Sequence, residues 1–564
     1  MDFLHGISHA VSEALSMDAE DIAAMMEKPP NREMGDYALP CFKLASRLKK
    51  APPLISKELT EKVIPPGFVS RMEAAGGYLN FFIDKSLFAK NTLERVMREG
   101  QAYGGSEEGR GKTICIDYSS INIAKPFHIG HLSTTVIGNA LYKLYSHLGY
   151  RCIGINHLGD WGTQFGKLIV AFKRWGDRER IEAGTVSEML RLYVKFHDEA
   201  EKDPSLEDEA RVWFKKIEDG DEEALSIFNF FKELTMRDVQ HVYDMLDIRF
   251  DSCAGESFYN DKTAAVIEEL RAKELLEESD GAFVVNLDEY GLPPCMIVKS
   301  DGATLYATRD IAAAIYRKKS YDFDKCLYVV AYQQNLHFKQ WFRVVEKMGY
   351  SWYKDLEHVA FGMVSMEEGT LSTRKGRVVL LEEVLKSSVG KARSIIEEKS
   401  PDLEDKDGAA RMVGVGAVVF GALINNRIKD IVFSYDRALN FDGETAPYVQ
   451  YTHARSCSVM RKSGGGVQGK IDYSLLCDDD AQEVVQNIAA FPATVKEACR
   501  RNEPSLIARL IVDLAQSFNR FYYDHRILEE DISLRNARLM LTDCTRHVIA
   551  LGLGLLGIAA PERM

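Results

Sequence analysis

Two histidines, His128 and His131, are the first residues in the sequence whose spacing suggests chemistry. They lie within YSSINIAKPFHIGHLSTT (residues 118–135), downstream of Lys125 and on either side of Gly130. A metal site would need a third ligand, and zinc-protease histidines stand at i and i+4 with a glutamate between them. The pair could otherwise be an incidental helix start, or a cradle in which two imidazoles and a lysine face an anion. These residues alone leave all three interpretations open.

The elements predicted around the histidines favour the anion cradle. TICIDYS is typical of a short strand, YRCIGINHLG of another, and the apolar residues between them recur at helical spacing: Ile137, Leu141, Leu144 and Leu148. Strand, helix and strand in under 50 residues predict a βαβ unit and a parallel sheet. The histidines would then lie between a strand end and a helix N-terminus, where free N–H groups favour a triphosphate.

Two further loops could complete such a pocket. NHLGDWGTQFG (residues 156–166) follows a strand with three glycines and a tryptophan, and TLSTRKG (residues 370–376) gathers hydroxyl and basic side chains. Taken alone, the second loop is typical of a solvated surface turn. Together with the histidine loop, it could clamp the far end of a triphosphate.

The chain is too long for one hydrophobic core, so we expect three domains. We predict an α+β domain over 1–108, a Rossmann-type parallel-sheet α/β domain over 109–400 and an all-α domain over 401–564. The middle domain would contain a helical insertion at about 175–285 and the second loop at about 366–377, with FVVNL, MIVKS and KCLYVVAY resuming its strands. In the last domain one helix face is predicted from Ile507, Leu510, Leu514, Phe518 and Phe521.

Composition narrows the function classes. Hydrophobic residues are 46% and charged residues 27%, and the longest apolar stretch, VIALGLGLLGIAA, is short enough to be a buried terminal helix. The ten cysteines include no CxxC pair, which favours reduced thiols in the cytoplasm and disfavours structural zinc. The formal charge of −13 means that a nucleic-acid partner would require a local basic face.

The motifs resemble those of a known family. SSINIAKPFHIGHLSTT is similar to the nucleotide-binding signature of class I aminoacyl-tRNA synthetases, and TLSTRKG to their second signature loop. NHLGDWGTQFG, GESFY, LYATRD and FDGETAPYVQYTHAR resemble arginyl-tRNA synthetases in particular. GDYALPCFKLA and AAGGYLNFF resemble their N-terminal domain, and DLAQSFNRFYYDHRIL their helical anticodon-binding domain. The resemblance therefore runs from end to end.

The resemblance implies an arginine–tRNA ligase that uses ATP, with Mg²⁺ held mainly by phosphates and water, and no metal ligands from the protein. It implies catalytic roles for His128, His131, Lys125 and Lys375. Lys125 would compensate for the loop position where Thr370 replaces the usual first lysine. The ATP-binding residues would be His128, Gly130, His131, Gly159, Asp160, Gly162, Gln164, Met363, Leu371, Ser372 and Arg374.

Arginine carries a planar, permanently charged fork that buried carboxylates suit. By position in the motifs, the arginine-binding residues would be Asp117, Ser119, Asn122, His131, Tyr306, Asp310 and Gln334. The alternative for Asp310 is a helix N-cap before IAAAIYR. Lysine could not satisfy the same fork, so no editing site would be needed.

The resemblance also implies tRNA(Arg) and L-arginine as partners of a cytoplasmic, monomeric enzyme with no membrane association. The tRNA-binding residues would be Tyr448, Gln450, Tyr451 and Arg455 for the anticodon, and Lys43, Arg47 and Asn80 for the elbow. Core packing is the alternative for the two tyrosines. The loop departs from the family pattern at Ile121, where proline is usual, and at Ser133, where arginine is usual.

Three other functions compete with this interpretation. A small-molecule adenylyl- or cytidylyltransferase shares the histidine motif but rarely has a helical C-terminal half. A non-enzymatic tRNA-binding protein would not need intact histidines and GDWGTQFG. A synthetase for a neutral amino acid would not need Asp117 and Asp310.

Overall fold

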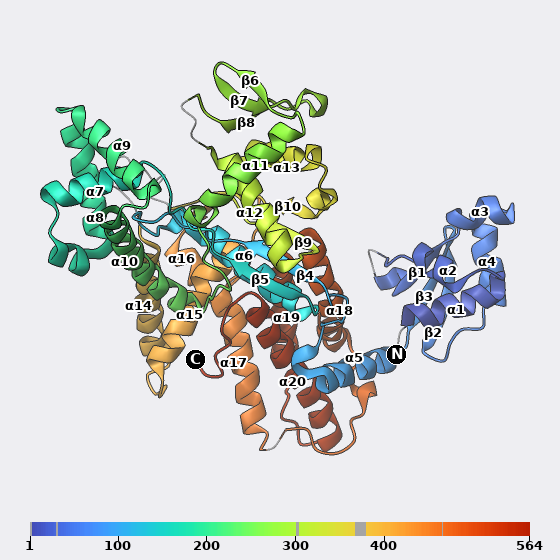
Figure 1. Ribbon diagram of the computed structural model, residues 1–564. Coiled ribbons are helices and arrows are strands. Elements are labelled where there is room, and N and C mark those ends of the chain that lie inside the picture. The colour runs from blue at the N-terminus through green and yellow to red at the C-terminus, as the bar shows by residue number, and fades with distance from the viewer. Residues whose placement is uncertain (1–2, 30–31, 301–303, 367–378, 465) are drawn as a thin grey trace. The chain divides into compact units, whose positions relative to one another are not determined.

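The computed structural model describes residues 3–29, 32–300, 304–366, 379–464 and 466–564 (Figure 1). The chain divides into two compact units. Unit 1 comprises Met1–Tyr103, Ser456–Ala489 and Gln516–His547, and unit 2 comprises Gly104–Arg455, Ala490–Ala515 and Val548–Met564. The predicted boundaries at 108 and 400 stay predictions.

Unit 2 is built on a four-stranded parallel sheet in the order β10-β9-β4-β5. The strands are β4 (Thr113–Asp117), β5 (Arg151–Ile155), β9 (Lys325–Tyr328) and β10 (Leu356–His358). Asp117 at the end of β4 pairs in register with Ile155 on one side and Tyr328 on the other. All five residues of β4 are buried, as expected for a central strand of a parallel sheet.

The predicted βαβ unit is confirmed. The 3₁₀ turn η3 (Ile129–His131) leads into α6 (Leu132–His147), and β5 returns parallel to β4. The helix packs tightly over the residue that follows β4, because a Cβ added to Gly138 would lie 2.2 Å from the Tyr118 ring. This packing holds the start of α6 at the carboxyl end of the sheet.

The segment predicted as a helical insertion at about 175–285 is helical through residue 272, and helix begins before it at Gln164. The helical segment contains α7 (Gln164–Trp175), α8 (Arg178–Ala200), α9 (Ser205–Glu218), α10 (Glu222–Leu246), η4 (Glu256–Tyr259) and α11 (Asn260–Ala272). Three strands follow: β6 (Glu277–Ser279), β7 (Ala282–Val285) and β8 (Cys295–Val298).

These three strands correct one expectation. FVVNL and MIVKS form β7 and β8 of a separate antiparallel sheet, β6-β7-β8, whereas KCLYVVAY supplies β9 of the parallel sheet. The connections between β6, β7 and β8 are short, and parallel pairing requires a crossover of about a dozen residues or more. The chain returns to the parallel sheet only after α12 (Tyr306–Tyr321).

The chain beyond residue 401 is mainly helical, as predicted, and one more helix, α14 (Leu381–Lys399), precedes it. The helices that follow are α15 (Lys406–Leu423), α16 (Tyr435–Ala438), α17 (Ala446–Lys462), α18 (Asp479–Arg501), α19 (Ser505–Asp524) and α20 (Ile532–Leu555). All five residues predicted to share a face of α19 are buried. One strand interrupts the pattern, because β12 (Ile431–Phe433) pairs in parallel with β11 (Val364–Met366).

Unit 1 begins with an α+β arrangement. Its sheet, β1-β3-β2, is antiparallel and contains β1 (Tyr37–Pro40), β2 (Val69–Ala75) and β3 (Tyr78–Ile83). The helices around it are α1 (Phe3–Leu15), α2 (Ala19–Met25), α3 (Phe42–Leu48), α4 (Pro52–Lys62) and α5 (Lys85–Glu99). Ile7, Leu39 and Phe81 are central in its core. Among the residues described, no helix of either unit has the length and apolarity to cross a membrane.

Candidate active site

The candidate site lies where the order of the parallel strands reverses. From β4 the chain moves to β5 on one side, and later places β9 on the other side of β4. Ligands of open α/β sheets bind at such a switch point, outside the carboxyl ends of the strands. The segments that leave this edge are the histidine loop after β4 and residues 156–163 after β5, as the sequence predicted.

The histidine loop is held in an unusual backbone conformation. Ser119, Ser120 and Ala124 all have positive φ, at 70°, 46° and 61°. Such values are uncommon for residues other than glycine and are concentrated at functional sites. Side chains from α6 and α10 fix the loop: the backbone nitrogen of Ser119 donates to Thr134 Oγ1 at 3.0 Å, and that of Ala124 to Thr235 Oγ1 at 3.1 Å.

The two histidines fix each other. His128 Nδ1 accepts a hydrogen bond from the Gly130 backbone nitrogen at 3.1 Å, so the proton of neutral His128 must lie on Nε2. His131 Nδ1 lies 3.2 Å from the backbone nitrogen of His128 and 3.3 Å from its carbonyl oxygen. The ring centroids are 4.0 Å apart. The pair is therefore a rigid unit in which His128 presents an N–H donor.

Both histidines are neutral at physiological pH. Burial, with a smaller effect from Lys125, lowers the pKa of His128, and burial together with His128 lowers the pKa of His131 to about 3. Charge at this point comes instead from Lys125, which is exposed and forms no ion pair with any residue that the structure describes. Neutral imidazole N–H donors beside the free ammonium of Lys125 suit the binding of an anion that is later released.

The second signature loop lies outside the described residues, and with it Lys375, Leu371, Ser372 and Arg374. The residues that flank it are described. On one side, the backbone nitrogens of Ile129 and Leu381 donate to the carbonyl oxygens of Val379 and Phe127, next to His128. On the other side is β11, and before it Met363, whose backbone nitrogen donates to Asp430 Oδ1 at 2.7 Å. The segment after the loop therefore meets the histidine segment directly.

The loop after β5 packs against the histidine loop. The Ile123 nitrogen donates to the Gly159 carbonyl and the Gly159 nitrogen to the Ile121 carbonyl, at 3.1 and 2.8 Å. A Cβ on Gly159 would lie 2.5 Å from Asn122 Oδ1, so a larger residue there would displace the Asn122 side chain. Gly162 has a φ of 139°, and Gln164 begins α7. Gly159 permits the close approach of the two loops.

Asp160 is a correction within this loop. Its side chain is 0% exposed, and both carboxylate oxygens are engaged. Oδ2 pairs with Lys232 Nζ at 2.6 Å and accepts from Ser257 Oγ at 2.7 Å, and Oδ1 accepts from the Ser257 nitrogen at 2.8 Å. Asp160 therefore ties the loop to GESFY and α10, and we remove it from the expected ATP contacts.

Asp117 and Ser119 are further corrections. Asp117 lies 2.8 Å from Arg317 Nη1 in a pair whose side chains are 7% and 1% exposed, and it accepts from Ser120 Oγ at 2.8 Å. An arginine of the chain itself therefore occupies the carboxylate expected to bind the substrate guanidinium. The Ser119 hydroxyl is buried against Tyr243 OH at 2.7 Å, so it too serves the loop.

The other expected arginine-binding residues reach the surface. Asp310 Oδ2 lies 2.6 Å from His337 Nε2, and both side chains are about a quarter exposed. Because α12 begins at Tyr306, Asp310 lies in its second turn, and the N-cap alternative is wrong. Tyr306 is 63% exposed at the start of this helix, and Gln334 is exposed at the turn before α13 (Asn335–Lys347).

Glu256 is a candidate that the sequence reasoning did not select. Its side chain is 15% exposed, and Oε2 lies 3.7 Å from Arg309 Nε without a hydrogen bond to either atom. Burial raises its pKa to about 7, with Asp310 and Asp160 adding to the rise and Arg309 and Lys125 opposing it. A mostly buried carboxylate whose Oε2 accepts no hydrogen bond, and whose pKa the acid Asp310 raises, is suited to an incoming cation in addition to Arg309. Its signal in the sequence was the position within GESFY.

Helix α17 separates the expected anticodon residues onto two faces. Tyr448, Tyr451 and Arg455 follow one face, and the Arg455 guanidinium carbon lies 4.8 Å from the Tyr451 ring centroid. Tyr451 is 42% exposed, which disfavours the core-packing alternative for it. Gln450 is a correction, because it is fully buried and donates through Nε2 to the carbonyls of Met412 and Ala559.

In unit 1 the residues expected to bind the tRNA elbow differ in whether their side chains are exposed and unpaired. Lys43 pairs with Glu27 at 2.7 Å, whereas Arg47 is exposed on α3 and forms no ion pair within the described part of unit 1. Asn80 lies within β3 and is mostly buried, so little of its side chain can reach a ligand. Tyr523, at the end of α19, is 89% exposed and offers a ring for stacking that the sequence did not single out.

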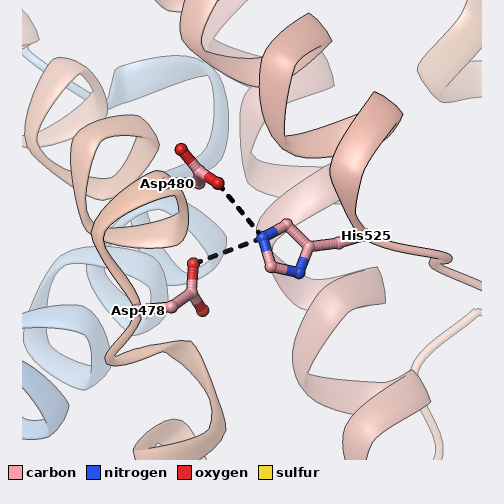
Figure 2. Close-up of side chains that lie close together, drawn as sticks. All are labelled: Asp478, Asp480 and His525. Carbon is pink, nitrogen blue, oxygen red and sulfur yellow. Dashed lines mark hydrogen bonds and ion pairs between the residues drawn. The ribbon is translucent and has the colours of Figure 1, made fainter.

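One cluster in the described chain has the composition of a metal site. Asp478, Asp480 and His525 lie together in unit 1, with His525 Nε2 at 3.6 and 3.3 Å from the two carboxylates (Figure 2). His525 Nδ1, however, lies 3.3 Å from Arg538 Nη2. A neutral imidazole bound to metal through Nε2 carries its proton on Nδ1, and a guanidinium cannot accept that proton. The cluster is therefore better suited to a hydrogen-bonded bridge from α19 to the start of α18.

The parallel sheet, the histidine cradle at its switch point and the helical C-terminal half define a class I aminoacyl-tRNA synthetase. Three family models match the chain: "tRNA synthetases class I (R), catalytic domain" over residues 92–435, "DALR anticodon binding domain" over 449–564 and "Arginyl tRNA synthetase N terminal domain" over 2–83. The chain belongs to the arginyl-tRNA synthetase family.

Its relatives match over their full length. The chain is 55% identical to an arginine–tRNA ligase of Clostridioides difficile, with 100% of both chains covered, and 55% identical to one of Alkaliphilus metalliredigens, with 98% of this chain and 99% of that one covered. The solved structure of the Thermus thermophilus arginyl-tRNA synthetase is similar with a TM-score of 0.83 at 26% identity, covering all of both chains.

The two departures from the family pattern lie inside the fold. Ile121 is buried and its carbonyl accepts from Gly159, while the Ser133 hydroxyl is buried at the start of α6 without a hydrogen-bonding partner in the described chain. Both side chains are therefore buried within the fold beneath the histidine loop and do not reach a ligand.

Proposed function

We propose that this chain is an arginine–tRNA ligase, which activates arginine with ATP to arginyl-adenylate and transfers it to the terminal adenosine of tRNA(Arg), releasing pyrophosphate and AMP. The observation that carries the amino acid specificity is the mostly buried carboxylate of Glu256, which accepts no hydrogen bond at Oε2 in the described chain and whose pKa is raised by Asp310. Lys125 of the histidine loop also acts on this carboxylate and lowers its pKa, which relates the cation site to the anion site.

In the activation step, the arginine carboxylate attacks the α-phosphate and charge builds up on the phosphate oxygens. Catalysis of such a step depends on positioning and on donors aimed at that charge. His128 and His131 would supply neutral N–H donors, and Lys125 a free ammonium. Gly130, Gly159, Gly162, Gln164 and the backbone at Met363 would shape the nucleotide pocket, with Lys375, Leu371, Ser372 and Arg374 closing it.

Mg²⁺ would accompany ATP. It keeps several waters and binds through substrate phosphates in sites of this kind. The described residues fit that mode, because Asp160 and Asp117, the buried carboxylates nearest the loops, are already paired with Lys232 and Arg317. When bound, the ion would neutralise phosphate charge while the side chains orient the nucleotide.

Glu256 and Asp310 would bind the arginine guanidinium. Asp117 would contribute indirectly, because it pairs with Arg317 on the helix that carries Asp310. The guanidinium fork would span the two carboxylates and stack on the exposed Tyr306 ring, with Gln334 at its side. Asn122 and His131 would hold the α-amino and α-carboxylate end. A lysine ammonium is a point charge that cannot satisfy both carboxylates with the same geometry, so it would be rejected.

Transfer requires a docked tRNA. Tyr448, Tyr451 and Arg455 on one face of α17 would stack on and contact anticodon bases. Arg47, and Lys43 after release from Glu27, would contact the elbow. We propose a monomer with the three domains bounded near residues 108 and 400.

ATP–pyrophosphate exchange tests this function. We expect exchange that depends on arginine, with and without tRNA compared, and none with lysine. Glu268→Gln, an exposed acid on α11, serves as the matched control for Glu256→Gln. Exchange without any amino acid, or no exchange under any condition, would contradict the proposal. Equal exchange with lysine would leave a synthetase but refute the assigned specificity.

A further inference from the structure

Unit 2 contains a second cavity, of about 490 Å³, at the edge of the parallel sheet. It lies between the β7–β8 connection, α13 and the 3₁₀ turn η7 (Ser351–Asp355), which precedes β10. Figure 1 shows the β6-β7-β8 sheet close to α13. Its lining comprises Tyr290, Leu292, Lys339, Phe342, Arg343, Tyr353, Lys354 and Leu356. None of these residues has a role in the proposed reaction. We call this cavity the Tyr290–Tyr353 pocket.

The position of the pocket separates it from the candidate active site. Lys354 and Leu356 lie at the amino end of β10, whereas the histidine cradle lies at the carboxyl end of β4. The volume falls within the range of about 300–1,000 Å³ that is typical of small-ligand sites. A separate ligand could therefore occupy the pocket without displacing ATP or arginine.

A single carboxylate behind the pocket holds its rings in place. Glu346 lies 2.5 Å from Arg343 Nη1, and the side chains of Arg343, Tyr353 and Tyr290 together lower the pKa of its carboxyl. The Arg343 guanidinium carbon lies 4.8 Å from the Tyr290 ring centroid. Two aromatic planes and a guanidinium plane are thus oriented before any ligand arrives, which reduces the ordering cost of binding.

The pocket is also positively charged. Its lining contains Lys339, Arg343 and Lys354 and no acid, in a chain whose formal charge is −13. Lys339 and Lys354 are exposed, and neither forms an ion pair with a residue in the described part of the chain. By contrast, Lys347 at the end of α13 pairs with Glu289 at 2.9 Å. Two free ammonium groups at the rim of an aromatic pocket favour an anionic ligand with a flat ring.

We propose that the Tyr290–Tyr353 pocket binds a nucleoside phosphate, with the base against the Tyr290 and Tyr353 rings and the phosphate near Lys339 and Lys354. Bases stack on aromatic side chains with little sequence preference, and lysines contact phosphate as point charges. The ligand is either a free nucleotide or an unpaired nucleotide of a bound RNA. An acidic peptide would use the lysines but leave the ring planes without a stacking partner.

Equilibrium dialysis of the full chain at low salt tests the pocket. The probes are uridine 5′-monophosphate, hexauridylate, inorganic phosphate and a hexaglutamate peptide, without added ATP, because a pocket with little base preference would also take up ATP. We expect both uridine probes to bind at least about tenfold more tightly than phosphate or the peptide. Equal affinities per site for the two uridine probes indicate a free nucleotide, and tighter binding of hexauridylate indicates RNA.

Two variants and a matched control assign the binding to this pocket. Tyr353→Leu should weaken uridine binding by about tenfold, and Lys339→Gln/Lys354→Gln should weaken it and flatten its salt dependence. Lys299→Gln/Lys319→Gln removes two exposed lysines elsewhere in unit 2 and should change nothing. Arginine-dependent exchange should persist in all of them. Unchanged uridine binding in both pocket variants, or equal binding of phosphate or peptide, would overturn the proposal, whether or not the ligase activity is found.

Discussion

The carboxylate of Asp117 and the guanidinium of Arg317 form a buried ion pair, with Oδ2 and Nη1 2.8 Å apart. Asp117 ends β4 and Arg317 lies on α12, so the pair joins the strand that leads to the histidines to the helix that carries Tyr306 and Asp310. Arg317 Nη2 also lies 3.4 Å from His157 Nδ1, in the loop after β5. One internal guanidinium on α12 therefore contacts both the end of β4 and the loop after β5.

Breaking this pair should cost stability asymmetrically. Arg317→Gln leaves a carboxyl that can take up a proton, whereas Asp117→Asn leaves a buried guanidinium that cannot lose one. We expect Asp117→Asn to lower the free energy of unfolding by about 3–5 kcal/mol and Arg317→Gln by less. Denaturant unfolding followed by circular dichroism measures both.

The control for this pair is the exposed ion pair of Arg393 with Asp407, where Arg393→Gln should leave stability unchanged. The double variant Asp117→Asn/Arg317→Gln should recover part of the loss. If Asp117→Asn instead raised the KM for arginine without affecting stability, Asp117 would contact substrate, as the sequence suggested.

Arginine binding should depend on the protonation of Glu256. Its pKa of about 7 in the free protein means that half of the carboxyl is protonated near neutrality. A guanidinium binds the ionised form, so affinity rises with pH and the KM for arginine at pH 6 should be about tenfold above that at pH 8. Initial rates of pyrophosphate exchange across this range measure the effect, while the KM for ATP should stay level.

Glu256→Gln should raise the KM for arginine by about 30-fold or more and remove its pH dependence. Glu268→Gln should keep both the wild-type KM and the wild-type profile. A pH-dependent KM that survives in Glu256→Gln would assign the titration to another group.

Gly159→Ala should disturb arginine binding through Asn122. The added methyl group would lie 2.5 Å from Asn122 Oδ1 and 3.4 Å from its Cα, so the side chain must turn away or the loop must shift. We expect a rise in the KM for arginine with overall stability nearly intact. Gly390→Ala, in the middle of α14 with nothing within 4 Å, is the matched control and should be neutral or slightly stabilising.

The double variant Asn122→Ala/Gly159→Ala decides whether the two residues act together. If the methyl group acts only through Asn122, the double variant should be no worse than Asn122→Ala alone. Additive losses would place the effect of Gly159 elsewhere in the loop.

Local pattern predicted much of this fold but little of its long-range pairing. The helix from Leu132 and the strands on either side were predictable, because their apolar spacing and the short connections permit only one arrangement. The antiparallel pairing of β7 and β8 was not, since four apolar residues do not reveal their partner. The Asp117–Arg317 pair joins residues 200 positions apart. Periodicity within a helix or strand cannot predict a contact between residues so far apart in the sequence. Gln450, by contrast, could have been assigned to the buried face of α17, because it lies two residues from Tyr448 and so on a different side of the helix.

The histidines should act as neutral donors at every working pH. With a pKa of about 3, His131 does not titrate between pH 5.5 and 8, so the rate of pyrophosphate exchange at saturating arginine should show no inflection near 6.5. His131→Asn should lower that rate by about 100-fold at each pH, as expected for the loss of one donor to a developing anion.

The lowered pKa of His131 also means that the unfolded chain, with an ordinary histidine, binds the proton more readily than the folded chain. Stability from this group is therefore complete above about pH 6.5 and is lost as the pH falls toward 3, so the melting temperature of the wild type should fall more steeply on acidification than that of His131→Asn. A rate profile in which activity falls as the pH rises through about 6.5 in the wild type and not in the variant would show that His131 works through its charge instead.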